Sequence, residues 1–315
     1  SAAEAIATAL RERYGTGCAA RIMNPLDYEG VPKMLRESQS DYDRLVREAP
    51  RLYRAGYNLS DDDVAATLVD GVLTLMLFEV LDQLLRAQQP DAIVTTYPLY
   101  QAPLDAIFQV RGHRIPLLTV ITDLVAVHTL WFHESVDLCF VATHAVGELA
   151  VSHGLSPNRV VVTGIPVKPA LLHLTGGTDS LRDTLGWRTD LRTVLVVGSD
   201  RVEHLRKVVG LLNDSDLDIQ IAAVAGGNDA LYEDFQTIEW RKEAHVYNFV
   251  ENLPAMMYAA DLIVCKAGGL IISESLAAGL PAIVVDALPG QEVGNAEYLV
   301  EQGVGSWARE PSEAL

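Results

Sequence analysis

Basic residues are scarce in this sequence. Its 315 residues include 24 lysines and arginines against 42 aspartates and glutamates, an acidic excess of 18. Proteins that bind nucleic acid broadly need a basic face to meet the phosphates, so this balance argues against that class. It argues equally against attraction of the whole molecule to anionic membranes, although a local basic patch stays compatible with it.

Cysteine and long apolar runs are scarce as well. Cys18, Cys139 and Cys265 are odd in number and widely spaced, and they form neither a CxxC pair nor a metal-ligand spacing. This usage fits a reducing, cytoplasmic compartment, and we expect no metal site. No apolar run reaches the length of a transmembrane helix, and there is no low-complexity segment.

Apolar residues are plentiful, at 49% of the chain, and they follow a repeated alternation. Short apolar runs predict strands, and stretches of helical periodicity predict the helices between them. In the first half the predicted strands are 91–98, 116–124, 135–143 and 158–166, and the predicted helices are 59–89, 104–112 and 144–154. The pattern restarts with predicted strands at 193–200, 219–227, 245–250, 261–265 and 281–290, each followed by a helical pattern.

Repeated strand–helix units are typical of a parallel sheet that is covered by helices on both faces. We therefore predict an α/β fold of two tandem doubly wound (Rossmann-like) domains, residues 1–165 and 166–315. Ligands of such sheets bind beyond the carboxyl ends of the strands. The loops that follow the strands are consequently the places to look for function.

The stretch "DLIVCKAGGLIISESLAAGLP" shows what one such loop contains. A strand-length apolar run is interrupted by Gly268 and Gly269, and helical spacing begins at Leu270. A glycine turn at the start of a helix aims bare backbone N–H groups beyond the strand, with the positive end of the helix behind them, and phosphate suits that position. A tight strand-to-helix turn without any ligand would use the same glycines.

Five loops of the second domain are predicted to meet at one sheet edge. Their glycine N–H groups, carboxylates and amide match a nucleotide sugar, which presents a pyrophosphate, a ribose diol and hexose hydroxyls. Plainer explanations exist: the helix dipole stabilises an acid such as Glu274, and Arg201 and Asn295 could simply face solvent. The loops hold Gly198, Ser199, Asp200 and Arg201; Gly226 and Gly227; Phe249 and Val250; Lys266 to Gly269; and Pro289, Gly290, Gln291 and Glu292.

The run "VCKAGGLIISESLAAGLPAIVVDALPGQEVGNAEYLVEQGVG" resembles the donor-binding region of the monogalactosyldiacylglycerol synthases. It is also similar to the processive diacylglycerol glucosyltransferases and, more distantly, to the peptidoglycan lipid-linked GlcNAc transferases. "VYNFVENLPAMMYAADLIVCK" continues the resemblance, and "LLTVITDLVAVHTLWFHESVDLCFVAT" resembles the family's acceptor-side segment. The resemblance covers nearly the whole chain. It implies a glycosyltransferase-B fold, a UDP-galactose or UDP-glucose donor, inversion at the anomeric carbon and no metal or other cofactor in the chemical step.

The resemblance also implies roles for individual residues. The backbone of Phe249 and Val250 would pair with the uracil edge, and Glu274 would hold the ribose. The remaining implied donor contacts are Gly268, Gly269 and Ser273 for the pyrophosphate, Gln291, Glu292 and Asn295 for the hexose, and Gly198, Ser199, Arg201, Lys266, Pro289 and Gly290 around them. The acceptor side would be bordered by Asp123, His128, Trp131, Phe132 and Tyr97.

Two departures from the family pattern concern the donor loops. Ala267 stands where the family often has proline, and "GSDRVEHL" is poorer in glycine than its counterpart, so Arg201 could supply charge to the phosphates. The general base is the open question. Among the 315 residues, His128 is the candidate for the general base, and Asp123 lies nearby in the sequence. The resembling families carry a strand and a glycine-rich loop ending in a histidine just before the helix that opens here, so we expect the main base upstream of Ser1.

The sequence also suggests how a lipid acceptor would be reached. The stretch 33–59 carries Lys33, Arg36, Arg44, Arg47, Arg51 and Arg54, interleaved with leucine and tyrosine. It suits a lipid surface, although a solvated helix pair would have the same pattern.

We therefore expect a glycosyltransferase that acts peripherally at the cytoplasmic membrane face and moves a hexose to a diacylglycerol-type lipid. A UDP-sugar epimerase, a glycosyltransferase with a soluble acceptor and a non-catalytic UDP-sugar binding protein stay as alternatives. The sequence does not choose galactose over glucose, and it does not report the oligomeric state.

Overall fold

The computed structural model describes residues 1–36, 63–173, 177–199, 204–288 and 292–315. These residues fall into two compact units, the first comprising residues 1–166 and the second the described residues from 167 onward. No helix in the described ranges is long and apolar enough to cross a bilayer.

The first unit contains a sheet of four parallel strands, in the order β1-β2-β3-β4, among its described residues. Consecutive strands pair in chain order, with Ile93 opposite Leu117 and Leu118 opposite Leu138. Its main elements are α1 (Ala2–Tyr14), α2 (Lys33–Arg36), α5 (Asp63–Gln88), β1 (Ile93–Thr95), α6 (Gln101–Arg111), β2 (Leu117–Val120), β3 (Leu138–Val141), α7 (His144–Ser152) and β4 (Val160–Val162).

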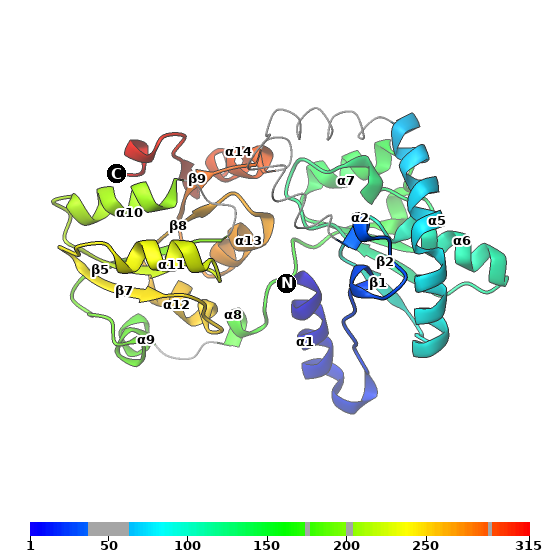
Figure 1. Ribbon diagram of the computed structural model, residues 1–315, viewed down its shortest axis with the longest axis horizontal. Coiled ribbons are helices and arrows are strands. Elements are labelled where there is room, and N and C mark those ends of the chain that lie inside the picture. Colours follow the sequence, from blue (N-terminus) through cyan, green and yellow to red (C-terminus); the bar gives the residue numbers. More distant parts are fainter. Residues whose placement is uncertain (37–62, 174–176, 200–203, 289–291) are drawn as a thin grey trace. The chain divides into compact units, whose positions relative to one another are not determined.

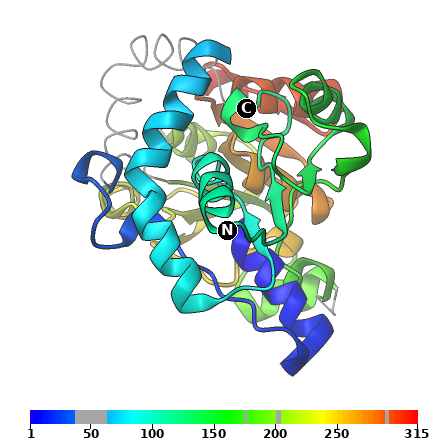
Figure 2. The same ribbon diagram turned by 90° about the vertical axis from the view of Figure 1, so that its right-hand side faces the viewer.

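Helices α5 and α6 lie side by side in both views of the molecule (Figures 1 and 2). Their apolar faces join the strands in one core, in which Leu77, Ile107 and Leu117 are fully buried. The long helical pattern ends where Pro90 follows, because proline cannot continue the backbone hydrogen bonds. Burial of apolar side chains from strands and helices together is what stabilises this unit.

The second unit contains a sheet of six parallel strands, in the order β10-β9-β8-β5-β6-β7, among its described residues. Its strands are β5 (Arg192–Val197), β6 (Ile219–Val224), β7 (Glu243–Tyr247), β8 (Leu262–Lys266), β9 (Ala282–Asp286) and β10 (Gly305–Trp307). Its helices are α8 (Ala170–His173), α9 (Thr178–Leu185), α10 (Leu205–Asp214), α11 (Asp229–Gln236), α12 (Leu253–Ala259), α13 (Gly269–Ala277) and α14 (Val293–Glu301).

The strand order makes this sheet doubly wound. From β5 the chain passes outward through β6 to β7, and then returns to β8 on the other side of β5. Crossovers between parallel strands are right-handed, so the two directions place their helices on opposite faces. Figure 1 shows α10 and α11 together in front of the strands, as this rule requires. The direction of winding changes between β5 and β8, and the loops after these two strands are therefore neighbours at the carboxyl edge.

The α/β prediction with two parallel-sheet halves is confirmed, and every predicted strand in the described ranges is present. One edge strand was not predicted: β10 is only three residues long and contains a glycine. The last residues form a short 3-10 helix, Pro311–Ala314.

Candidate functional site

The loops after β5 and β6 touch through their backbones. Gly226 has a φ of +71°, and a Cβ there would lie 2.1 Å from the carbonyl oxygen of Gly198. The Gly198 N–H donates to the carbonyl of Val224 at 2.7 Å. A Cβ on Gly198 would lie 2.5 Å from Leu231 Cδ2 and 3.0 Å from the Ala225 carbonyl oxygen, so packing alone favours glycine at both positions. For Gly198 and Gly226 the plainer explanation, a tight turn, is sufficient.

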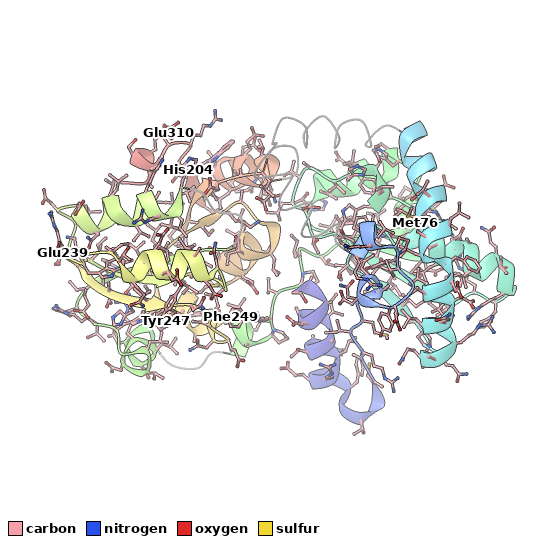
Figure 3. The ribbon with its side chains drawn as sticks, in the orientation of Figure 1. Met76, His204, Glu239, Tyr247, Phe249 and Glu310 are labelled. Atoms are coloured by element: carbon pink, nitrogen blue, oxygen red, sulfur yellow. The ribbon has the colours of Figure 1, made fainter. Side chains whose placement is uncertain are left out.

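An aromatic side chain stands exposed beside these loops. Phe249 follows β7, and its side chain is 70% exposed. Gly227 lies next to it, since a Cβ on Gly227 would come within 3.9 Å of the Phe249 ring. The Gly227 N–H donates to the carbonyl of Asn248, which ties the two loops together. Figure 3 shows Phe249 beyond Tyr247, the last residue of β7.

The turn between β8 and α13 leaves the start of the helix without a side-chain cap. Gly268 is the N-cap residue and has no side chain to accept from the first helical N–H groups. Ala267 holds the turn in place: its N–H donates to the carbonyl of Asp286 at 2.7 Å, and its carbonyl accepts from Asn295 Nδ2 at 3.0 Å. The orphan N–H groups and the positive end of the helix form an anion-attracting position.

Glu274 lies further along the same helix and is buried, with 8% of its surface exposed. The described residues give its carboxylate neither a hydrogen bond nor an ion pair. Burial raises the pKa of Glu274, and the positive charge of Lys168 opposes this only in part. A buried carboxylate without a partner costs stability, so its presence calls for a ligand that donates hydrogen bonds.

Lys266 and Glu292 form an ion pair at this edge. The Lys266 ammonium bonds to Glu292 Oε1, and Glu292 Oε2 accepts from the N–H of Leu288 at 3.1 Å. The side chains are 19% and 8% exposed. Both carboxylate oxygens of the predicted hexose ligand Glu292 are thus engaged within the protein.

A histidine–aspartate pair that the sequence did not reveal lies beside them. Asp286, the last residue of β9, accepts from His204 Nδ1 at 2.8 Å and from the His204 N–H at 3.1 Å. His204 directly precedes α10, at the end of that helix in Figure 3. The two residues are 82 positions apart, and no motif connects them in the sequence. The contact fastens the end of the loop after β5 to the end of β9.

Asn295 is wholly buried, so the idea that it is a surface residue on its helix is wrong. It lies in the first turn of α14, and its amide bonds the turn that carries Gly268. Ser273 is half-buried on α13, Val250 is half-buried after β7, and the Ser199 carbonyl accepts from Asn228 Nδ2 at 3.3 Å. The predicted donor residues Arg201, Pro289, Gly290 and Gln291 lie outside the described residues.

In the first unit, His128 caps the short 3-10 helix Thr129–Trp131, and its Nδ1 accepts from the N–H of Leu130 at 3.2 Å. The Nδ1 atom of His128 thus acts as an acceptor in the capping contact. Asp123, just beyond β2, is buried at 7% exposure.

The aromatic residues of the predicted acceptor side serve the packing of the first unit. Trp131 belongs to the hydrophobic core at 4% exposure. Phe132 stacks on His153, with ring centroids 4.9 Å apart. Tyr97 lies 5.8 Å from the ring of Tyr100. The structure thus brings the described donor candidates to one edge of the second sheet, and it places the acceptor candidates in the first unit.

Comparison with known proteins identifies both halves. A family model described as monogalactosyldiacylglycerol (MGDG) synthase matches residues 1–167, and one described as the glycosyltransferase family 28 C-terminal domain matches residues 193–312. These two models between them cover most of both units.

Curated relatives and solved structures agree with these models. The chain is 30% identical to the MGDG synthase of Spinacia oleracea over 99% of its own length and 62% of the relative's, and 30% identical to a probable MGDG synthase 2 of Oryza sativa subsp. indica over 100% and 69%. It thus spans less than two thirds of the spinach enzyme.

Among solved structures, S. aureus MnaA with UDP matches at TM-score 0.60 and 17% identity, covering 78% of this chain and 70% of that one. Acinetobacter baumannii MurG matches at TM-score 0.51 and 18% identity, covering 76% and 65%. These two likenesses support the fold. The resemblance inferred from the sequence is confirmed by the family model and the curated relatives, and the chain belongs to the monogalactosyldiacylglycerol synthase family.

Proposed function

We propose that this protein is an inverting glycosyltransferase that moves a hexose from a UDP-sugar to a diacylglycerol-type lipid. Membership of the MGDG synthase family supports this, since the product in the relatives' name is a diacylglycerol carrying one galactose. The structural observation that carries the proposal is Glu274, a buried carboxylate without a bonded partner among the described residues, on the helix whose start is uncapped. A ribose diol supplies the two donors that such a carboxylate lacks.

The proposed donor pose follows from the chemistry of each loop. The pyrophosphate lies at the Gly268 and Gly269 N–H groups, where the helix dipole favours negative charge. The ribose bonds Glu274, and the uracil lies beside Phe249, whose exposed ring offers an apolar surface next to Gly227. The hexose then extends toward Asn295 and the loop before α14.

The proposed reaction breaks the bond between the anomeric carbon and the pyrophosphate oxygen and forms a bond to the acceptor hydroxyl oxygen. The hydroxyl attacks from the face opposite UDP, and a general base takes its proton. Negative charge grows on the departing UDP, and preorganised N–H groups at the start of α13 stabilise it.

Galactose is the proposed donor sugar, because monogalactosyldiacylglycerol is the compound in the relatives' names. Because the acceptor is a lipid, we propose that the protein works peripherally at a membrane surface. The basic stretch 33–59 supplies the charge for that contact, although residues 37–62 lie outside the described residues.

The test is incubation of the full-length protein with diacylglycerol vesicles and either UDP-galactose or UDP-glucose, with products read by mass spectrometry. A galactosylated lipid with UDP-galactose, and much less product with UDP-glucose, is the expected result. Conversion of the sugar nucleotide to an epimer without lipid would show an epimerase instead. Donor binding with neither outcome would show a non-catalytic binding protein.

A further inference from the structure

Lys266 occupies an unusual position for a cation. It ends β8 two residues before the N-cap of α13, and its Nζ lies 3.3 Å from the point where a Cβ on Gly268 would be. The ammonium therefore lies over the glycine turn at the positive end of a nine-residue helix. Cations are favoured at the other end of a helix, so the helix dipole disfavours a lysine here, and the ion pair with Glu292 holds its ammonium in place.

The strand itself is adjusted at this residue. Cys265 pairs with Val284, but Lys266 pairs with Asp286, so the register of β8 and β9 shifts between them. Such irregularities at the ends of strands change the direction of a side chain and are common near functional sites. The same helix carries Glu274, more than nine-tenths buried and without a hydrogen-bond or ion-pair partner among the described residues. This is an independent sign that α13 takes part in binding a ligand.

Glu292 differs from Glu274 because both of its carboxylate oxygens already have hydrogen-bond partners within the protein. It is 6% exposed, Oε1 is bonded to Lys266, and Oε2 accepts from the N–H of Leu288. Each oxygen keeps a second acceptor position, but burial leaves a hexose hydroxyl little access to it. Displacing either existing bond would leave a buried ammonium or N–H without a partner, which is costly. The geometry of Glu292 suits a residue that orients Lys266 rather than one that contacts sugar.

We infer that Lys266 binds the pyrophosphate of the donor directly and that Glu292 is a positioning residue for Lys266 instead of a hexose ligand. This inference rests on the proposed function, and it assigns the charge that opposes the departing UDP. The ammonium has three N–H donors, so it can keep its bond to Glu292 while donating to a phosphate oxygen. Loss of a hydrogen bond to a charged group lowers affinity by about 10- to 100-fold.

The experiment compares the affinities of uridine, UDP and UDP-galactose by calorimetry for the full-length protein and its variants. Lys266→Met should lower UDP affinity about 10- to 100-fold and leave uridine affinity within about twofold, because uridine has no phosphate. Glu292→Gln should shift the UDP-to-uridine ratio by about threefold or more, but only while Lys266 is present. The ratio of UDP-galactose to UDP should stay within about twofold in Glu292→Gln.

Matched controls carry the same charge change elsewhere. The controls are Lys242→Met and Glu297→Gln. Lys242 lies just before β7, at the amino edge of the sheet, and Glu297 is exposed on α14. Both should behave as the parent chain. In Lys266→Met the buried carboxylate of Glu292 loses its partner, which could prevent folding. In that case the double variant Lys266→Met and Glu292→Gln, which removes both charges, replaces the single variant. Uridine binding checks that the variant is folded.

Each outcome decides the inference. An unchanged UDP-to-uridine ratio in Lys266→Met, or in the double variant, would overturn the phosphate contact. A tenfold fall in the UDP-galactose-to-UDP ratio in Glu292→Gln would show that Glu292 touches the hexose. Failure of the proposed function looks different, because the parent chain would then bind UDP no better than uridine.

Discussion

At the scale of single residues, two carboxylates of the second unit illustrate the difference between folding and function. Asp261 precedes β8 and accepts from Arg182, Arg192 and the N–H of Thr193. Burial raises the pKa of Asp261, but these bonds outweigh burial and the net pKa is lowered. Glu274 lies after β8, has no such bonds, and burial raises its pKa. Asp261 stabilises the fold at the amino edge of the sheet, whereas we propose that Glu274 binds a ligand beyond the carboxyl edge.

Replacement of Glu274 should therefore affect binding more than folding. Glu274→Ala is expected to weaken UDP binding by about 1.5–3 kcal/mol, the scale of hydrogen bonds to a charged group. Glu274→Gln keeps the shape and loses the charge, so it serves as a control for packing. The measurement is calorimetric titration with UDP, and unchanged affinity in the alanine variant would rule out the ribose role.

The two carboxylates should also show opposite dependence on pH. Folding raises the pKa of Glu274, so the contribution of this side chain to the free energy of unfolding is most favourable in acid, where the carboxyl is neutral. That contribution is lost as the pH rises through the pKa of the folded state. Glu274→Gln should consequently raise the free energy of unfolding at pH 7 and have little effect at pH 4. Denaturant unfolding at both pH values checks this.

Asp261→Asn should behave in the opposite way. The pKa of Asp261 is lowered on folding, so its contribution is present above the unfolded pKa and is lost as pH falls through the folded pKa. Its removal leaves the buried Arg182 without its carboxylate, and we expect a loss of roughly 3 kcal/mol at pH 7. That loss should shrink in acid, with UDP affinity per folded molecule kept. A loss that does not vary with pH would contradict the assignment.

At the scale of elements, the loops after β5 and β6 depend on a backbone contact. Gly226 and Gly186 have nearly the same φ, +71° and +70°, but only Gly226 has another backbone against the position of its Cβ. Alanine at either position costs roughly 1–3 kcal/mol for the left-handed conformation. Gly226→Ala should cost about 2 kcal/mol more than Gly186→Ala, because it also pushes against Gly198. Equal losses in denaturant unfolding would show that the two loops separate easily.

The elements of this fold could be predicted from the sequence because parallel strands are buried on both faces and read as continuous apolar runs. Residues 219–224 are a clear case, since every residue of β6 is buried. The short edge strand β10 has no such run, and it forms because it pairs with β9. Local pattern cannot reveal a strand that depends on its neighbour.

The candidate site was predictable to the same extent. The glycine turn and Glu274 are close in sequence, so their motif is legible. The bonds of His204 to Asp286 and of Lys266 to Glu292 join residues 82 and 26 positions apart. The burial of Asn295 follows from the packing of α14 against the turn at Ala267. Such contacts form only once the sheet has assembled, so the spacing of residues in the sequence does not predict them.

At the scale of the whole molecule, an acidic protein must reach a lipid acceptor. The sequence concentrates basic residues in the stretch 33–59, of which residues 37–59 lie outside the described residues. Each basic residue near an anionic surface adds about 1 kcal/mol. Replacement of Arg47, Arg51 and Arg54 by glutamate should abolish co-sedimentation with anionic vesicles and leave UDP affinity unchanged.

The matched control for this prediction reverses three exposed basic residues of the second unit, Arg206, Lys207 and Arg241. It makes the same change in net charge and should leave vesicle binding intact. Equal loss in both triple variants would mean that net charge alone governs the attraction. Equal vesicle binding by both variants and the parent would show that the stretch 33–59 does not bind the anionic surface.

The central claim is that the carboxyl edge of the second sheet holds a UDP-hexose whose sugar is passed to a lipid. Transfer of labelled galactose from UDP-galactose to diacylglycerol, measured at low donor concentration for the full-length protein, Glu274→Ala and Glu297→Ala, tests it most directly. We expect labelled lipid from the parent, the same amount from Glu297→Ala, and about tenfold less or lower from Glu274→Ala. Equal transfer by Glu274→Ala, or no labelled lipid from the parent, would contradict the claim.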